Sequence, residues 1–492
     1  MSQDLLLGAR TNATDVQEFL SLRYANRHGL VAGATGTGKT VTLQGLAEGF
    51  SKAGVPVFLA DVKGDLSGFC EPSAKEDFLI KRAETIGFAP SFVPEAFPVA
   101  FWDMFGEKGL PMRTTISEMG PLLLSRILDL NDTQEGVLNI AFKMADEEGL
   151  LLLDMKDLRA LLVSMSERTK EISAEYGNVT TASIGSIQRA LLQVEEQGGE
   201  MFFGEPALSI IDFMRHDAQG RGTINVLNAA KIMATPKLYA VFLLWLMSEL
   251  FEELPEVGDQ EKPRLVFFFD EAHLLFSNAP KALLEKIEQV IKLIRSKGVG
   301  LYFITQNPAN IPESVLAQLG NRIQHGLRAF TPQQQKDIRE AAQTYRPNPE
   351  FDVEAVINEL SVGEALISTL QEKGQPSIVQ RVLIRPPLSK LGACSPEAVR
   401  FAINSSELFT KYQQSIDRES AYELLKKKAE MAALQAQRAQ EEADMARTQK
   451  ASAPRRSNRQ TTGEAFVKSM IRTIGSQVGR EIIRGVLGAM RR

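Results

Sequence analysis

The stretch that decides the fold of this chain is Gly33-Ala34-Thr35-Gly36-Thr37-Gly38-Lys39-Thr40, directly preceded by the apolar run Leu30-Val31-Ala32. It fits the pattern G-x-x-x-x-G-K-[ST], a loop between a buried strand and a helix that holds nucleotide phosphates. Glycine backbones reach angles that other residues adopt only with strain, so successive N–H groups can point inward at one anion. The helix predicted from Lys39 onward adds the positive end of its dipole. The stretch therefore predicts a phosphate-binding loop; a plain glycine-rich turn is the alternative.

Nucleotide contacts are expected along this loop and the first helical turn. Lys39 would reach the β- and γ-phosphates, and the Thr40 hydroxyl would ligate Mg²⁺. The predicted nucleotide-binding residues are Gly33, Ala34, Thr35, Gly36, Thr37, Gly38, Lys39, Thr40 and Val41.

A second nucleotide signature lies downstream, where an apolar run ends in Asp270-Glu271. A carboxylate at the carboxyl end of a strand, here Asp270, can hold the Mg²⁺ shell beside the phosphate loop. The adjacent Glu271 can polarise a water for attack on the γ-phosphate. An apolar run followed by two acids is weak on its own, but downstream of a phosphate loop it predicts a hydrolysing ATPase.

The next predicted strand ends in Thr305-Gln306, on the edge of a parallel sheet where ligands bind. Gln306 would contact the γ-phosphate or the attacking water; the alternative is an amide that stabilises the turn before Asn307-Pro308. The sequence has no N-K-x-D guanine-reading motif, so ATP is the expected nucleotide.

Length and composition are those of an ordinary soluble globular protein, with 492 residues, 44% hydrophobic and 24% charged. No apolar run reaches the roughly 18 residues that a membrane span needs, and the N-terminus does not read as a signal peptide. The two cysteines make neither a disulfide framework nor a zinc site, and the four scattered histidines give no metal cluster. We expect a cytoplasmic protein.

The net charge of −5 is unevenly distributed. Residues 451–492 carry nine Lys/Arg against two acids, so the first 450 residues carry a net charge of −12. An acidic body argues against a protein that coats nucleic acid over its whole surface, but it leaves a localised basic channel open. The basic tail is a separate electrostatic unit.

The alternation of strand, helix and strand around the loop is typical of a parallel sheet. We predict an α/β fold whose P-loop NTPase core, with a mostly parallel central sheet, comprises residues 1–70 and 221–390. Residues 71–220 are expected to form a mostly helical insertion. Near the N-terminus we expect a short strand at Leu5–Leu7 and a helix near Asp15–Leu22.

Three further segments follow the predicted core. A helical arm over residues 391–450 has alanines at alternating steps of four and three, which favours a coiled coil and a solvated lone helix about equally. Residues 451–463 form a basic linker. Residues 464–492 form a basic amphipathic helix that would dock on a partner subunit, an anionic lipid surface or nucleic acid, and its glycines favour docking on protein.

Taken together, these motifs resemble the bacterial HerA-like helicase family, in the HerA/FtsK branch of RecA-like P-loop ATPases. The resemblance covers roughly residues 1–390 and is carried by residues 26–40, Asp61–Leu66, Phe267–His273 and Thr305–Pro308. It implies a RecA-like fold and a ring, typically a hexamer, with ATP at subunit interfaces and an arginine supplied in trans.

The candidates for that arginine are Arg295, Arg322 and Arg328, each of which would equally serve in a surface salt bridge. An arginine in trans matters because it neutralises charge that develops only in the transition state. The resemblance also implies DNA as a partner, because relatives pump double-stranded DNA through a central pore. The sequence departs from those relatives in having barely thirty residues before the loop, no C-terminal winged helix and no transmembrane anchor.

Two main hypotheses of function follow. The residues themselves predict an ATPase, and the resemblance predicts a ring-forming DNA translocase or helicase. The alternative is an oligomeric ATP-dependent assembly or scaffold ATPase that docks protein partners through its C-terminal arm. A third hypothesis, in which the basic tail tethers the ring to anionic membrane, is the one we favour least.

Overall fold

The computed structural model describes residues 4–234, 236–258, 260–276 and 281–451. The chain divides into two units, Met1–Lys426 and Lys427–Arg492. All but the first residue of the linker predicted at 451–463, and the whole helix predicted at 464–492, lie outside the described residues.

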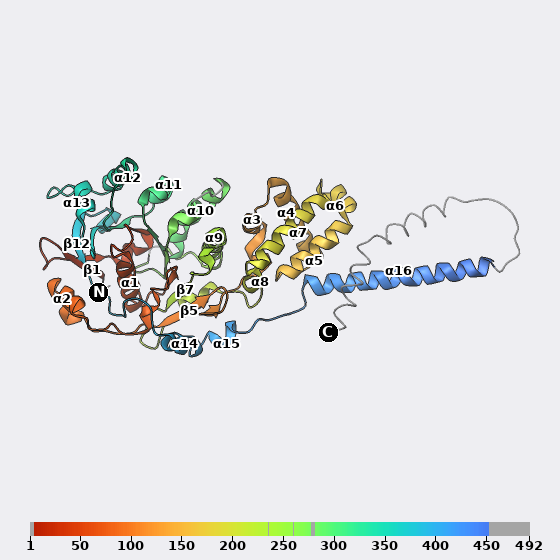
Figure 1. Cartoon of the computed structure of the whole chain (residues 1–492), viewed down its shortest axis with the longest axis horizontal. Coiled ribbons are helices and arrows are strands. Elements are labelled where there is room, and N and C mark those ends of the chain that lie inside the picture. The colour runs from red at the N-terminus through yellow and green to blue at the C-terminus, as the bar shows by residue number, and fades with distance from the viewer. Residues whose placement is uncertain (1–3, 235, 259, 277–280, 452–492) are drawn as a thin grey trace. The chain divides into compact units, whose positions relative to one another are not determined.

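A 12-stranded sheet forms the centre of the first unit (Figure 1). From β10 to β6 neighbouring strands are parallel, whereas β11, β12, β1 and β2 pair antiparallel at the other end. The mostly parallel α/β sheet expected from the sequence is thus confirmed. In spatial order the strands are β2 (Gln17–Leu20), β1 (Leu5–Arg10), β12 (Gln380–Ile384), β11 (Glu364–Ser368), β10 (Asn321–Gln324), β3 (Gly29–Ala32), β9 (Val299–Thr305), β8 (Leu265–Phe269), β4 (Val57–Asp61), β7 (Ile224–Asn228), β5 (Val99–Asp103) and β6 (Leu110–Pro111).

Helices cover both faces of this sheet, which is why its central strands are continuous apolar runs. In β8, Val266 and Phe268 pack into the cluster that contains the apolar side of α1. Phe267 and Phe269 point the other way, into the cluster that contains α9 and α10. The helices of the first unit are α1 (Lys39–Lys52), α2 (Asp77–Thr85), α3 (Ile116–Ile127), α4 (Asp132–Glu148), α5 (Met155–Glu167), α6 (Thr169–Tyr176), α7 (Thr181–Glu196), α8 (Gly199–Phe202), α9 (Pro236–Glu253), α10 (Lys281–Leu293), α11 (Glu313–Leu316), α12 (Pro332–Gln343), α13 (Val353–Glu359), α14 (Pro396–Asn404) and α15 (Phe409–Tyr412).

The N-terminal segment forms a β-hairpin, so the helix expected near Asp15–Leu22 is wrong. β2 pairs antiparallel with β1, with Leu5 opposite Leu20. Arg10 and Glu18 form an ion pair across the hairpin. Four residues are too few for periodicity to separate a strand from a helical turn, and the pairing with β1 decides the conformation.

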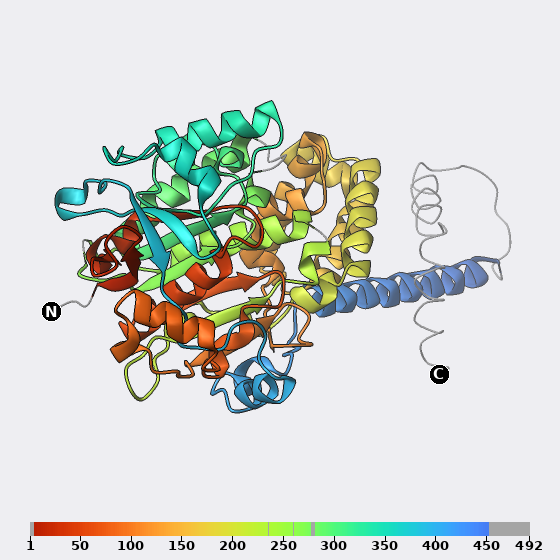
Figure 2. The ribbon, with the colours of Figure 1, turned by 60° about the vertical axis from the view of Figure 1, so that its left-hand side comes forward.

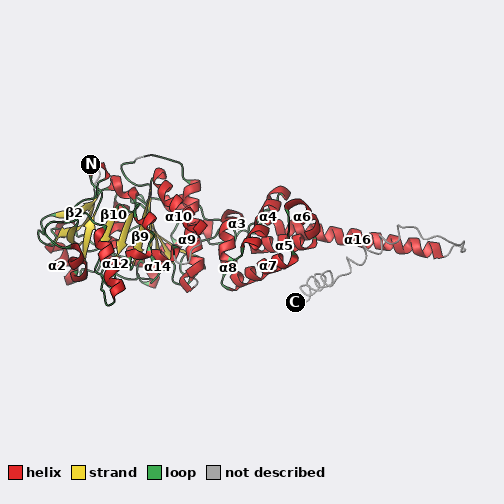
Figure 3. Cartoon of the chain, turned by 90° about the horizontal axis from the view of Figure 1, so that it is seen from above, coloured by secondary structure: helices red, strands yellow, loops and turns green. Residues whose placement is uncertain are grey.

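The helical insertion is narrower than the sequence suggested, because β5 and β6 belong to the sheet. β5 pairs parallel with β7, and the buried Trp102 donates its indole N–H to Asn225 Oδ1 at 3.0 Å. Helices α3–α8 gather beside the sheet (Figures 1 and 3). Their apolar side chains join the cluster that includes α9, so the insertion and this face of the sheet share one core.

A strap, residues 388–423, leaves the sheet after β12 and first follows the ATPase core. Lys390 Nζ lies 2.6 Å from Glu71 Oε2. Cys394 forms a disulfide with Cys70, which is 324 residues away in the sequence, although no disulfide framework was expected from the two cysteines. Figure 2 shows α14 and α15 of the strap, in blue, below the sheet.

The strap then continues onto the helical insertion. Arg113 Nη1 donates to the Tyr412 carbonyl oxygen at 2.9 Å, and Ser420 Oγ donates to Asp157 Oδ1 at 2.5 Å. The amide of Ala421, the first residue of α16 (Ala421–Ala451), donates to the Leu151 carbonyl at 3.0 Å. The strap therefore joins the sheet to the insertion. In the second unit, most side chains described between residues 427 and 445 are exposed.

Candidate active site

The loop proposed to bind phosphate lies between β3 and α1, where the sequence placed it. Gly38 precedes the helix with a φ of 110°, a value that glycine reaches without strain. A Cβ on Gly33 would lie 2.5 Å from the Cβ of His325, so no larger residue fits there. The Gly33 amide donates to the Thr305 carbonyl of β9 at 3.2 Å, which anchors the loop to the neighbouring strand.

Lys39 folds back over the loop. Its Nζ donates to the carbonyl oxygens of Gly33 and Ala34, the latter at 2.9 Å. Burial lowers the pKa of Lys39, repulsion from Lys63 lowers it further, and Asp270 and Glu271 raise it. The ammonium group is therefore within electrostatic reach of the acid pair, as the predicted roles require.

Asp270 and Glu271 follow β8 at the same edge of the sheet. The amide of Glu271 donates to Asp270 Oδ1 at 2.9 Å, and the Tyr239 hydroxyl of α9 donates to the Asp270 carbonyl at 3.1 Å. Burial and then the charge of Glu271 raise the pKa of Asp270 to about 6. A cation beside Asp270 would offset both effects.

Glu271 adopts a left-handed backbone conformation, with a φ of 50°. Non-glycine residues rarely take such angles, and they do so most often where function requires it. Its side chain accepts hydrogen bonds from Gln306 Nε2, at 3.1 Å to Oε1 and 3.4 Å to Oε2. His273 Nδ1 lies 3.4 Å from Glu271 Oε2.

Strand order explains why these side chains meet. β9 lies between β3 and β8, and all three are parallel, so their carboxyl ends share one edge. Thr305 is in register with Ala32, which places Gln306 beside the start of the loop. Three segments far apart in the sequence thus bring Lys39, Gln306 and the acid pair together.

His325 lies beneath the loop and is not among the residues predicted from the sequence. It follows β10, the other neighbour of β3, and it is fully buried. Its Nδ1 donates to the Glu364 carbonyl at 2.9 Å, so Nε2 accepts from the Thr42 hydroxyl of α1 at 2.9 Å. Burial lowers the pKa of His325 to about 4, so the ring is neutral. The polar pair Gln324-His325 at the end of a strand was the available signal.

The three candidate arginines occupy different places. Arg295 precedes β9 and so lies toward the amino ends of the strands. Arg322, in β10, donates to the carbonyls of Leu319 and Leu316 at 3.1 and 2.8 Å and so closes the end of α11. Arg328 lies beyond β10, toward the carboxyl ends where the loop lies, and is exposed.

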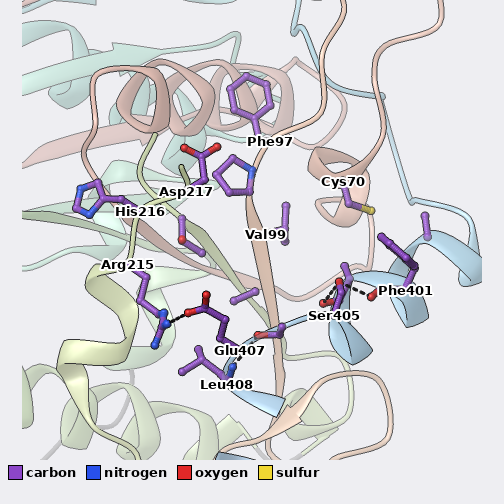
Figure 4. Close-up of a pocket in the computed structure, with 16 residues that line it drawn as sticks. Cys70, Phe97, Val99, Arg215, His216, Asp217, Phe401, Ser405, Glu407 and Leu408 are labelled. Carbon is purple, nitrogen blue, oxygen red and sulfur yellow. Dashed lines mark hydrogen bonds and ion pairs between the residues drawn. The ribbon is translucent and has the colours of Figure 1, made fainter. Parts of the chain in front are cut away.

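A groove of about 450 Å³ lies elsewhere, between the amino ends of β5 and β7 and helix α14. Figure 4 shows Arg215 directed at Glu407 on one side and Phe401 on the other. In parallel α/β sheets, ligands bind beyond the carboxyl ends of the strands. The groove is therefore separate from the candidate active site.

The strand order, the phosphate loop and the acid pair define a RecA-like P-loop NTPase fold. The chain belongs to the family described as "Helicase HerA-like C-terminal", which matches residues 7–492. The resemblance drawn from the sequence motifs is confirmed. No helix in the described part of the chain is both long and apolar enough to cross a membrane.

Two relatives illustrate the family. The chain is 23% identical to the DNA double-strand break repair helicase HerA of Sulfolobus acidocaldarius over 364 residues, 72% of this chain and 64% of that protein. It is 33% identical to a probable helicase of Methanocaldococcus jannaschii over 154 residues, 29% of this chain and 28% of that protein. The chain thus spans less than two thirds of the length of these relatives.

Solved structures share the fold. The plasmid coupling protein TrwB, in complex with the ATP analogue ADPNP, matches with a TM-score of 0.52 and 14% identity, over 80% of this chain and 95% of that one. VirB4 of Thermoanaerobacter pseudethanolicus matches with a TM-score of 0.51 and 16% identity, over 81% and 98%.

Proposed function

We propose that this protein is an ATP-hydrolysing motor of the HerA type. The observation that carries the proposal is the meeting of Lys39, Gln306 and the Asp270–Glu271 pair at the carboxyl ends of three adjacent parallel strands. Lys39 binds the β- and γ-phosphates, Glu271 polarises the attacking water, and Gln306 contacts that water or the γ-phosphate. The loop from Gly33 to Val41 holds the remaining phosphate oxygens.

The residues present fit Mg²⁺. Thr40 and Asp270 supply the hydroxyl and carboxylate oxygens that this ion prefers, and the buried Asp270 is a carboxyl group that a cation would keep ionised. When bound with ATP, the ion would neutralise charge on the phosphate oxygens.

The substrate on which the motor acts is proposed to be DNA. Family membership and the similarity to the Sulfolobus DNA repair helicase support DNA translocation or unwinding by a ring. We propose that this ring is a homo-hexamer in the cytoplasm. In such a ring one of Arg295, Arg322 and Arg328 would reach the ATP of the neighbouring subunit. Of the three, Arg328 starts from the edge of the sheet that carries the loop.

The test is ATP hydrolysis by the full chain with and without duplex DNA. We expect the rate to rise when DNA is added. A robust rate that is indifferent to DNA of any form would contradict DNA translocation and leave ATP hydrolysis standing. An image of the nucleotide-bound particle would show the stoichiometry of the ring and which arginine faces the γ-phosphate.

The second candidate function is an assembly or scaffold ATPase that docks protein partners through its C-terminal arm. The observation that favours it is α16, a 31-residue helix with largely exposed side chains over its described second-unit part. Because the strap belongs to the first unit, the truncated variant should lack the chain from Lys427 onward and keep the strap. Loss of a protein partner on truncation, with DNA stimulation intact, would favour this function.

A further inference from the structure

The turn after β4 is held in one conformation by the side chain of Asp61, the last residue of that strand. Asp61 is buried, and its Oδ1 accepts from the amides of Gly64 and Asp65 at 2.7 and 3.2 Å. Its Oδ2 accepts from the amide of Leu66 at 3.0 Å. Gly64 has a φ of 77°, which lets the chain reverse within the turn. Residues 61–66 therefore form a fixed loop, and Lys63 stands at its exposed side.

This turn begins beside the acid pair. β4 and β8 are parallel neighbours with Leu59 opposite Phe268, so two residues further along both strands Asp61 is level with Asp270. Lys63 follows two residues later, at the edge of the sheet that carries Lys39 and Gln306. The turn thus borders the γ-phosphate side of the candidate active site, since the residues assigned to hydrolysis lie between it and β3.

The charge of Lys63 reaches into the site. Burial lowers the pKa of Lys39 most, and Lys63 is the second cause. Burial and Glu271 raise the pKa of Asp270, while Lys63 and Lys39 lower it. Lys63 and Lys39 therefore repel each other while both attract Asp270, which places the two ammonium groups on either side of the acid pair.

Lys63 has no hydrogen bond or ion pair with any residue that the structure describes. Lys52 and Lys390 of the first unit are paired with glutamates, whereas the exposed Lys170, like Lys63, has no hydrogen bond or ion pair among the described residues. Lys63 is therefore presented by a rigid turn, and no residue that the structure describes holds its ammonium group.

We propose that Lys63 binds the γ-phosphate of ATP, opposite Lys39, and so makes the site prefer a nucleoside triphosphate to a diphosphate. This inference rests on the proposed function. Lys39 serves the β- and γ-phosphates together, whereas a cation on the far side of the acid pair contacts only the last phosphate. An ammonium on a phosphate oxygen forms a charge-assisted bond, stronger than a neutral one.

The test compares Lys63→Met with Lys170→Met, a matched change of an exposed lysine on α6 in the helical insertion. Affinities for ATPγS and ADP are measured by calorimetry with Mg²⁺ present. For Lys63→Met we expect the affinity for ATPγS to fall about tenfold, with the affinity for ADP unchanged. Lys170→Met should match the unsubstituted protein for both ligands.

Lys39→Ala tests the proposed function separately from the inference about Lys63. If Lys39→Ala abolishes binding while Lys63→Met keeps the original ratio of ATPγS to ADP affinity, the inference about Lys63 is overturned and the proposed function stands. If Lys39→Ala binds nucleotide normally, both are overturned. Because Lys63 is exposed and unpaired among the described residues, its replacement should leave the fold intact.

Discussion

Gln306 at the end of β9 donates through its Nε2 to both carboxylate oxygens of Glu271, at 3.1 and 3.4 Å. The contact links Gln306, which we propose contacts the γ-phosphate or the attacking water, with Glu271, which we propose activates that water. While the amide bonds the carboxylate, it occupies lone pairs that a water would use. A γ-phosphate that attracts the amide would release the carboxylate, so substrate binding and base activation would be coupled.

We predict that Glu271→Gln binds ATP but lowers turnover about 100-fold or more, because an amide cannot accept the proton of the water. Gln306→Ala should also lower kcat while leaving ATP affinity nearly unchanged. Single-turnover hydrolysis and equilibrium binding measure the two effects, with Gln219→Ala, in an exposed turn, as the control. Hydrolysis by Glu271→Gln at a rate near the original would show that another group activates the water.

The bond between Thr42 and His325 should support nucleotide affinity from beneath the loop. Thr42→Val leaves Nε2 of the buried ring without its donor, and His325→Ala removes the ring. Each substitution should weaken ATP binding about 3–10-fold. Because both break the same contact, the double variant should bind ATP only slightly more weakly than the weaker-binding single variant. Thr85→Val, which removes a hydroxyl that donates to the Lys81 carbonyl within α2, is the control. Fully additive losses would refute the coupling.

Glu249 should make the protein less stable as the pH rises toward 8. Burial, then Glu118, Glu253 and Glu252, raise the pKa of Glu249 to about 7 from an ordinary value of 4.5. Between those values the folded state holds a proton that the unfolded state has released, so this contribution to stability is present below pH 4.5 and is lost as the pH rises through 7.

Glu249→Gln removes this titration. It should raise Tm at pH 8 by about 2–4 °C and have no effect at pH 4.5. Variant and unsubstituted protein are compared at the same pH. Burial lowers the pKa values of His28 and His325 to about 4, so these two residues make both proteins more stable as the pH rises. Equal Tm values at pH 8 would contradict the prediction.

The ion pair between Glu48 of α1 and Arg385 should be a major contributor to stability. The two side chains are 0% and 6% exposed and their charged atoms lie 3.0 Å apart. Glu48 also accepts from the amides of Leu388 and Ser389, both at 2.9 Å. Glu48→Ala strands a buried charge and should cost about 3–5 kcal/mol in urea unfolding. Glu397→Ala, from an exposed pair with Arg400, should change stability little.

The residues proposed to bind and hydrolyse ATP could be chosen from the sequence because each of them belongs to a local motif. Gly33–Thr40, Asp270-Glu271 and Gln306 each follow an apolar run, and the carboxyl ends of parallel strands share one edge of a sheet. That these residues also lie close together depends on the order of the strands, because β9 lies between β3 and β8.

What the sequence could not supply depends on contacts between distant segments. His325 lies under the loop only because β10 is the neighbour of β3, and Asp61 fixes its turn through bonds that no spacing encodes. Residues 17–20 are a strand because they pair with β1 at the edge of the sheet. The β-like pattern of Pro98–Trp102 does not show that β5 joins the central sheet until its pairing with β7 is known. Cys70 and Cys394 likewise meet across 324 residues.

The strap also sets the order in which parts of the polypeptide can finish folding during synthesis. Asp157, near the start of α5, is fully buried and accepts from the Ser420 hydroxyl and the Tyr422 amide, more than 260 positions later. Until those residues have left the ribosome, this carboxylate lacks two of its partners. The helical insertion is translated early but completes these hydrogen bonds only after residues 420–422 have been made, so the unfinished insertion is exposed to aggregation in the meantime.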